Sequence, residues 1–215
     1  ENEYFNGSIV SKDKSITYDA NFSLIKSDIL NDGLNVFKNE YFYPFDPIFF
    51  NEYGFVSLMT GHRFGERVLT NKFKNSIKLL EEKVIYGSCG PNSLLILPKK
   101  LIKHKTDLTN NEGDINSIEI TLRDEKGNIL ETTDNAGIKT SFIWGYNKTE
   151  VIAKLENTPY SSIYESLRDN CQLQSNTGTE ATLIDSLNTL RGAMSNSLVS
   201  TYTYKPLIGV STLTD

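Results

Sequence analysis

The sequence predicts a mainly β protein, an antiparallel meander of β-hairpins with a short pair of helices near the C-terminus. Tyrosine and phenylalanine are abundant, at 11 residues each, while the hydrophobic content is 38%. This balance is typical of sheets that bury one face and expose the other to water. Because helical periodicity is concentrated in residues 158–197, we expect hairpins rather than alternating βα units.

The N-terminal part predicts hairpins and one short helix. Residues 15–24 form the first hairpin, with Asn21 at a turn position of positive φ, which asparagine tolerates better than most residues. Asn31-Asp32-Gly33 is a second turn signal, and an aromatic strand follows over residues 34–45. Apolar residues spaced by three predict a short helix over residues 51–59, which a following glycine ends.

The middle of the chain predicts further strands. Residues 77–86 and 94–103 are two strands joined by a loop rich in glycine, serine, proline and asparagine. The polar stretch 106–114 predicts a long exposed turn, and residues 115–122 predict a strand with isoleucine and leucine on one face. A turn then leads into a short strand at residues 129–132.

The clearest alternation of side chains lies in a predicted hairpin. Residues 139–146 are rich in β-branched and aromatic side chains with a period of two, and residues 151–156 alternate again after a short turn. Trp144 lies in the first strand between Phe142 and Tyr146, on the same face as these two rings. We therefore expect the indole to be buried and structural.

Two helices are predicted next. Thr158 suits an N-cap, and Pro159 suits the first turn because its missing N–H would have no partner there. Thr179 caps the second helix, where leucines recur at helical spacing until Gly192. A last strand follows over residues 198–204 and has no charged residue between Ser200 and Tyr204. Because such an edge is unprotected, we expect a strand from elsewhere to pair with it.

Five short islands follow one another in the last third of the chain: Phe142–Asn147, Val151–Asn157, Tyr160, Leu187–Arg191 and Thr201–Val210. In this order they resemble the segment before the tyrosine-aspartate repeats of large RHS-type proteins of the Bacteroidota. The resemblance implies that the chain is a fragment of a longer exported polypeptide whose later repeats build a spiralling β-sheet shell. It implies no catalytic residue and no cofactor.

The resemblance suggests three regions and a set of partners. Residues 1–157 would form a β-hairpin region with an RHS-shell-like or sandwich-like sheet, residues 158–197 a helical pair, and residues 198–215 a strand leading into the repeats. The implied partners are the remainder of the same chain and the outer-membrane export machinery of the phylum. The implied location is exported, at the cell surface, periplasm-facing or extracellular, and the implied role is structural rather than enzymatic.

Charge and hydropathy exclude other classes. The net charge of −5 arises from 22 basic and 27 acidic residues spread along the chain, which argues against a nucleic-acid partner and an anionic membrane surface. The longest apolar runs, such as residues 94–97, are far shorter than the ~20 residues that cross a bilayer. No transmembrane segment is predicted.

Exposed aromatic rings provide an alternative function. Tyr41, Tyr43, Trp144 and Tyr146 are candidates for stacking on sugars, which would make the chain a carbohydrate-binding module. Cross-strand packing inside a sheet explains the same residues. Exposure distinguishes the two hypotheses, because a stacking ring must be open to solvent.

Motifs for catalysis or metal binding are absent from the sequence. The two histidines and two cysteines have no metal-ligand spacing, and Ser88 and Cys89 lack the frame of a nucleophile elbow. Cys89 and Cys171 either form a disulfide, which export would permit, or remain two unpaired buried thiols. We predict no catalytic, cofactor-binding or metal-binding residue.

Overall fold

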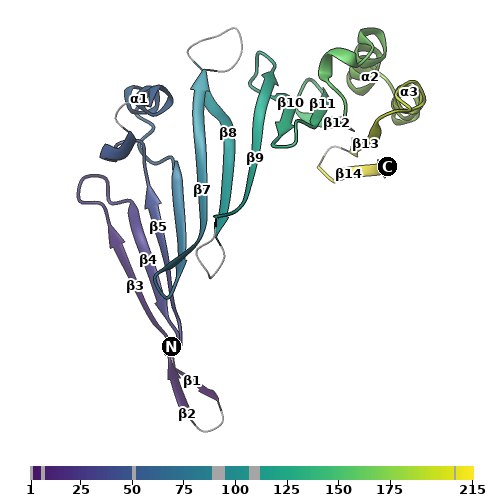
Figure 1. The fold of residues 1–215 in the computed structure, drawn as a ribbon. Helices are drawn as coiled ribbons and strands as arrows, with labels where there is room; N and C mark the ends of the chain where they lie inside the picture. The colour runs from purple at the N-terminus through teal and green to yellow at the C-terminus, as the bar shows by residue number, and fades with distance from the viewer. Residues whose placement is uncertain (1, 6–7, 50–51, 89–94, 107–111, 206) are drawn as a thin grey trace. The chain divides into compact units, whose positions relative to one another are not determined.

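The computed structural model describes residues 2–5, 8–49, 52–88, 95–106, 112–205 and 207–215 (Figure 1). Twelve strands, β3 to β14, form one antiparallel sheet in sequence order. A separate hairpin of β1 (Asn2–Phe5) and β2 (Ser8–Ser11) precedes them. The predicted β meander is therefore confirmed. Two compact units are present, one with residues up to Ser88 and Ile96–Ile118, the other with Glu119–Asp215.

The first unit contains six strands of the meander: β3 (Asp13–Tyr18), β4 (Ile25–Asn31), β5 (Val36–Phe42), β6 (Leu69–Lys74), β7 (Ile77–Ser88) and β8 (Ile96–Thr106). Gly33 has a φ of +85°, as its turn requires. In the β3–β4 turn, however, Ser23 rather than Asn21 has the positive φ, at 55°. The Asp19 carboxylate accepts the Asn21 amide at 2.9 Å and so sets this different turn geometry.

A short helix contributes two of the buried residues in the core of the first unit. Helix α1 (Tyr53–Thr60) confirms the helix predicted near residues 51–59. It packs close to β7, because a Cβ on Gly54 would lie 2.0 Å from the Tyr86 carbonyl oxygen. The sequence does not predict strand β6, since its two lysines and one asparagine obscure the apolar alternation. The buried side chains of this core are Phe49, Phe55, Leu58, Val68, Leu69 and Tyr86.

The second unit contains the C-terminal strands and two helices. Strand β9 (Glu112–Arg123) contributes residues to both units. The exposed turn predicted over 106–114 is wrong at Thr106, which ends β8, and for residues 112–114, which begin β9. The remaining elements are β10 (Ile129–Asp134), β11 (Lys139–Gly145), β12 (Glu150–Glu156), α2 (Glu165–Thr177), α3 (Glu180–Ala193), β13 (Leu198–Lys205) and β14 (Gly209–Thr214).

Helices α2 and α3 pack together on one face of strands β11 to β13 (Figure 1). Their leucines meet the apolar face of β12, so this layer is the main core of the unit. The fully or almost fully buried residues are Ile143, Ile152, Ala153, Leu155, Ile163, Cys171, Leu183, Leu187, Leu190, Met194 and Val199.

The ends of the helices differ from the prediction at two of three positions. Thr158 caps no helix, because its buried hydroxyl donates to Ser197 and α2 begins only after Tyr164. Thr179 does cap α3, and its side chain accepts the Thr182 amide. Gly192 does not end α3, which continues to Ala193 because the next residue, Met194, is buried in the core.

The predicted burial of Trp144 is wrong. In β11 the buried residues are Ser141, Ile143 and Gly145, while Phe142 and Trp144 are half-buried. The small residues permit close approach of α2, since a Cβ on Gly145 would lie 2.5 Å from the Ser175 hydroxyl. The helices therefore cover Ser141, Ile143 and Gly145, and the indole of Trp144 is not part of this core.

The predicted open edge at residues 200–204 is also wrong. Strand β14 pairs antiparallel with β13, from Thr201 opposite Thr214 to Lys205 opposite Gly209. The partner strand thus comes from residues of this chain to which the sequence pattern assigns no strand. Pro206, the predicted end of the pairing, lies outside the described residues.

Candidate functional site

The two aromatic candidates of the first unit are engaged in packing. Tyr43 is 2% exposed, and its hydroxyl donates to a β4 carbonyl at 2.8 Å. The half-buried Tyr41 donates to the Asp28 carboxylate at 2.6 Å, and the Arg67 guanidinium lies 4.3 Å from its ring centroid. Burial, and then the hydrogen bond to Asp28, raise the pKa of Tyr41. Tyr43 is therefore no exposed stacking ring, and one face of Tyr41 is covered by arginine.

The other two candidates lie in the second unit and are both half-buried. The indole N–H of Trp144 donates to the Ile129 carbonyl at 2.7 Å, which fixes the ring. Tyr146 packs edge-on against Tyr204, with ring centroids 5.6 Å apart. The four candidates therefore do not form one platform. Trp144 lines one pocket of the second unit, and Tyr146 lines another pocket of the same unit together with Tyr204.

The Trp144 pocket has a volume of about 380 Å³ and lies entirely within the second unit. Strand β11 places Trp144 in its wall, and the segment leading into α2 places Tyr160 there. Arg168 and Gln172 lie one turn apart on α2 and therefore share a helix face. The rest of the lining comes from the turn regions and β10: Arg123, Asp124, Glu125, Leu130 and Lys148.

Charges of both signs line the Trp144 pocket. Lys148 forms an ion pair with Glu125, and this contact raises the pKa of Lys148. Arg168 bonds Asp169 at 2.9 Å, and its guanidinium lies 5.5 Å from the Tyr160 ring centroid. Burial raises the pKa of Tyr160, so its hydroxyl stays protonated at neutral pH. Donors and acceptors are therefore both present beside two aromatic rings.

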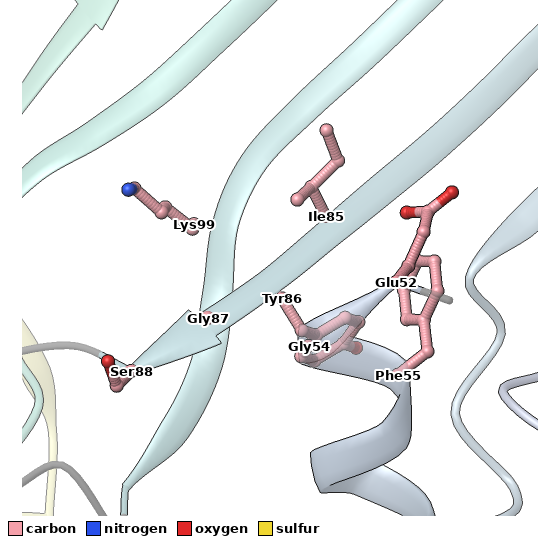
Figure 2. Close-up of a pocket in the computed structure, with 8 residues that line it drawn as sticks. All are labelled: Glu52, Gly54, Phe55, Ile85, Tyr86, Gly87, Ser88 and Lys99. Carbon is pink, nitrogen blue, oxygen red and sulfur yellow. The ribbon is translucent and has the colours of Figure 1, made fainter. Parts of the chain in front are cut away.

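A pocket of the first unit lies where α1 meets β7 and β8, and measures about 400 Å³ (Figure 2). Glu52, at its rim, is paired with Lys83 at 2.8 Å. Figure 2 shows Ser88 and Lys99 on the side away from Glu52. Among the described residues, neither a histidine nor a carboxylate bonds the Ser88 hydroxyl, so no activated nucleophile is formed.

A buried tyrosine also lines this first pocket. Burial, and then the neighbouring Glu66 carboxylate, raise the pKa of Tyr86 to about 12. The Tyr86 hydroxyl donates to Glu66 at 3.1 Å. A phenol with this pKa is neutral at physiological pH and stabilises the core rather than acting as a base.

The cysteine prediction is tested at one of its two positions. Cys171 lies on α2 and is fully buried, and burial raises the pKa of its thiol to about 11. Cys89 lies outside the described residues, so its pairing with Cys171 stays a prediction.

Within the described ranges, no group of three or more His, Cys, Asp or Glu side chains is placed to bind a metal ion. In the same ranges, no helix is long and apolar enough to cross a membrane.

No protein-family model matches the chain, and no curated protein matches it in sequence. The candidate site is therefore defined by its geometry alone. Sequence reasoning identifies Trp144 but misses its neighbours Tyr160, Arg168 and Gln172. The spacing of Arg168 and Gln172 by four residues indicates that both lie on one face of a helix. The hydrogen bond from Gln172 to the Trp144 carbonyl, however, depends on where α2 begins.

Proposed function

We propose that this chain is a non-catalytic structural and interaction segment of a large exported RHS-like surface protein, in which it supplies hairpins that prime or cap the repeat shell. The observation that supports this proposal concerns the five islands of the resemblance. Their side chains form the contacts that attach the helical pair and the last strands to the sheet.

Two tyrosines form the first of these contacts. The Tyr146 hydroxyl accepts the backbone N–H of Tyr204 at 3.0 Å. The Tyr204 hydroxyl in turn donates to the Val151 carbonyl at 3.0 Å. Each of the three residues belongs to a different island, and these contacts support a structural role for the islands.

Arg191 forms the second contact. Its guanidinium donates to the Thr201 hydroxyl at 2.8 Å and to the Thr214 carbonyl, also at 2.8 Å. One side chain of α3 thus bonds both β13 and β14. An arginine used in this way positions a helix over a sheet edge, because its planar fork can bond two acceptors at once.

The final strand supports a partner within the same longer chain. β14 pairs with β13 on one side and is the last strand of the sheet. Residues 209–214 contain no charged side chain, and Val210 and Leu213 are more than half exposed. An uncharged edge readily accepts another strand. In the proposal this strand comes from the tyrosine-aspartate repeats, and the Bacteroidota outer-membrane export machinery delivers the chain to the surface.

The complete coding sequence tests this proposal. We expect a signal peptide upstream and Tyr-Asp-x-x-Gly-Arg repeats downstream of these residues. Protease treatment of intact cells should then remove epitopes of this segment while a cytoplasmic marker stays intact. A stop codon directly after Asp215, or full protection of the segment in intact cells, would contradict it.

The carbohydrate-binding alternative, in the form of four exposed rings, is not favoured by the burial of Tyr43 and Tyr41. One observation does favour a narrower form. Trp144 lies in a polar pocket with a second ring, Tyr160, and with charged side chains at hydrogen-bonding positions.

A further inference from the structure

We propose that the Trp144 pocket binds a neutral saccharide, with the indole and the Tyr160 ring facing the sugar's C–H surface and the Arg168, Lys148 and Glu125 side chains bonding its hydroxyls. This binding is independent of the scaffold role proposed above. It concerns one pocket of the second unit, not the sheet edge.

The pocket has the size and rigidity that ligand binding requires. Its volume of about 380 Å³ lies in the lower part of the ~300–1,000 Å³ range of small-molecule sites. Hydrogen bonds hold both the side chain and the backbone carbonyl of Trp144. Its indole N–H bonds the Ile129 carbonyl at 2.7 Å, and its own carbonyl accepts Gln172 at 2.9 Å. A ring that is already immobile loses little entropy on binding.

The charges favour a hydroxyl-bearing neutral ligand. Lys148 is paired with Glu125, and Arg168 is paired with Asp169, so each of these two cations lies beside a carboxylate. Arg123 and Asp124 add a further charge of each sign to the lining. A sugar hydroxyl donates and accepts, and can therefore bond both members of such a pair. A phosphate or carboxylate ligand would only accept, so it could bond the basic side chains of the lining but not the carboxylates of Asp124 and Glu125. The aromatic rings supply the apolar contact that the C–H face of a sugar needs.

The sole tryptophan of the chain is Trp144, so its fluorescence reports directly on this pocket. The protein is titrated with maltose, cellobiose, lactose, mannobiose and chitobiose, and with glucuronate and ATP as anionic probes. We expect a saturable change in emission with at least one neutral disaccharide. Lys148→Met and Arg168→Met should each weaken that binding about tenfold or more, because each removes a charged hydrogen-bond donor.

Matched variants separate this effect from general changes in charge or folding. Lys154→Met also removes one positive charge from the second unit but lies outside the pocket, and the exposed Tyr164 permits a Tyr164→Phe control. Both controls should bind as the wild type does. If circular dichroism shows that Arg168→Met is not folded, the affinity of the turn variant Lys148→Met for the disaccharide tests the proposal instead. No saturable change with any neutral disaccharide, a response to the anionic probes alone, or equal affinity in all variants would overturn the proposal.

Discussion

The backbone N–H of Tyr204 donates to the Tyr146 hydroxyl at 3.0 Å, across 58 residues of sequence. That hydroxyl also lies 3.3 Å from the Tyr204 carbonyl, to which it donates. The contact joins the end of β11 to β13 across the intervening strand β12. One phenol thus satisfies both backbone groups of a residue beside the bulge of β13.

Removing this phenol should destabilise the protein without affecting the core. Tyr146→Phe leaves the Tyr204 N–H without a partner, so we expect the free energy of unfolding to fall by about 1–3 kcal/mol. Tyr164→Phe removes a hydroxyl from a residue that is 60% exposed and should change stability by less than ~0.5 kcal/mol. Urea denaturation of both variants measures the difference, and equal midpoints would show that the contact contributes nothing.

Two glycines should respond to alanine in opposite directions. A Cβ at Gly145 would lie 2.5 Å from the Ser175 hydroxyl and 2.7 Å from Ile152, so Gly145→Ala should cost about 1–3 kcal/mol through overpacking. Gly192 lies within α3, where an added Cβ would meet no atom within 4 Å, so Gly192→Ala should stabilise by about 0.5–1 kcal/mol. A thermal midpoint of Gly145→Ala that is unchanged or raised would refute the close approach of α2 to β11.

The partial burial of Trp144 can be tested by comparing two truncations. Leu155→Ala removes a fully buried side chain of the core and should cost ~2–5 kcal/mol. Trp144→Ala removes a half-buried ring, and we expect a smaller loss of about 1–2 kcal/mol. If the tryptophan variant is the less stable of the two in urea, the indole is part of the core after all.

A buried carboxylate should make stability depend on pH. Burial by itself would raise the pKa of Glu131, but Lys139, the Thr121 hydroxyl and the Tyr160 amide, all within 2.8 Å, together lower it. Because the unfolded chain then binds the proton more readily, the stabilisation is present at neutral pH and is lost as the pH falls below about 4.3.

The variant Glu131→Gln tests this linkage. At pH ~7 it should cost about 1–3 kcal/mol, because the charged hydrogen bonds are lost. The difference in unfolding free energy between wild type and variant should shrink as the solution is acidified through the window below about 4.3. A difference that stays constant from neutral to acid pH would mean that the carboxylate has an ordinary pKa.

The thiol of Cys171 should be unreactive in the folded protein. It is fully buried, and burial raises its pKa to about 11, so little thiolate forms at neutral pH. In a Cys89→Ser background, we expect iodoacetamide to label Cys171 only after unfolding. Labelling of the native protein at the rate of a free cysteine peptide would contradict this expectation.

The same reagent tests the predicted disulfide. Wild-type protein recovered from an oxidising compartment is alkylated without reductant and weighed intact. Two labels after unfolding would exclude the bond between Cys89 and Cys171, and no label would establish it.

Local chemistry determined much of this fold. The Asn31-Asp32-Gly33 turn, the hairpin of β11 and β12 and the Thr179 cap are all predictable, because turn and capping preferences depend on a few adjacent residues. Alternation likewise identifies the strands around residues 77–103. These features need no knowledge of what packs against them.

Tertiary structure alone decided which face of β11 is buried, where α2 begins and which strand covers β13. Both faces of β11 carry apolar residues, and the choice was made by the approach of Ser175 to Gly145. Thr158 is a buried partner of Ser197 instead of a helix cap. The carbonyl of Trp144 accepts a hydrogen bond from Gln172, which lies 28 residues away in the sequence. Each outcome rests on contacts between distant residues, which side-chain periodicity does not encode.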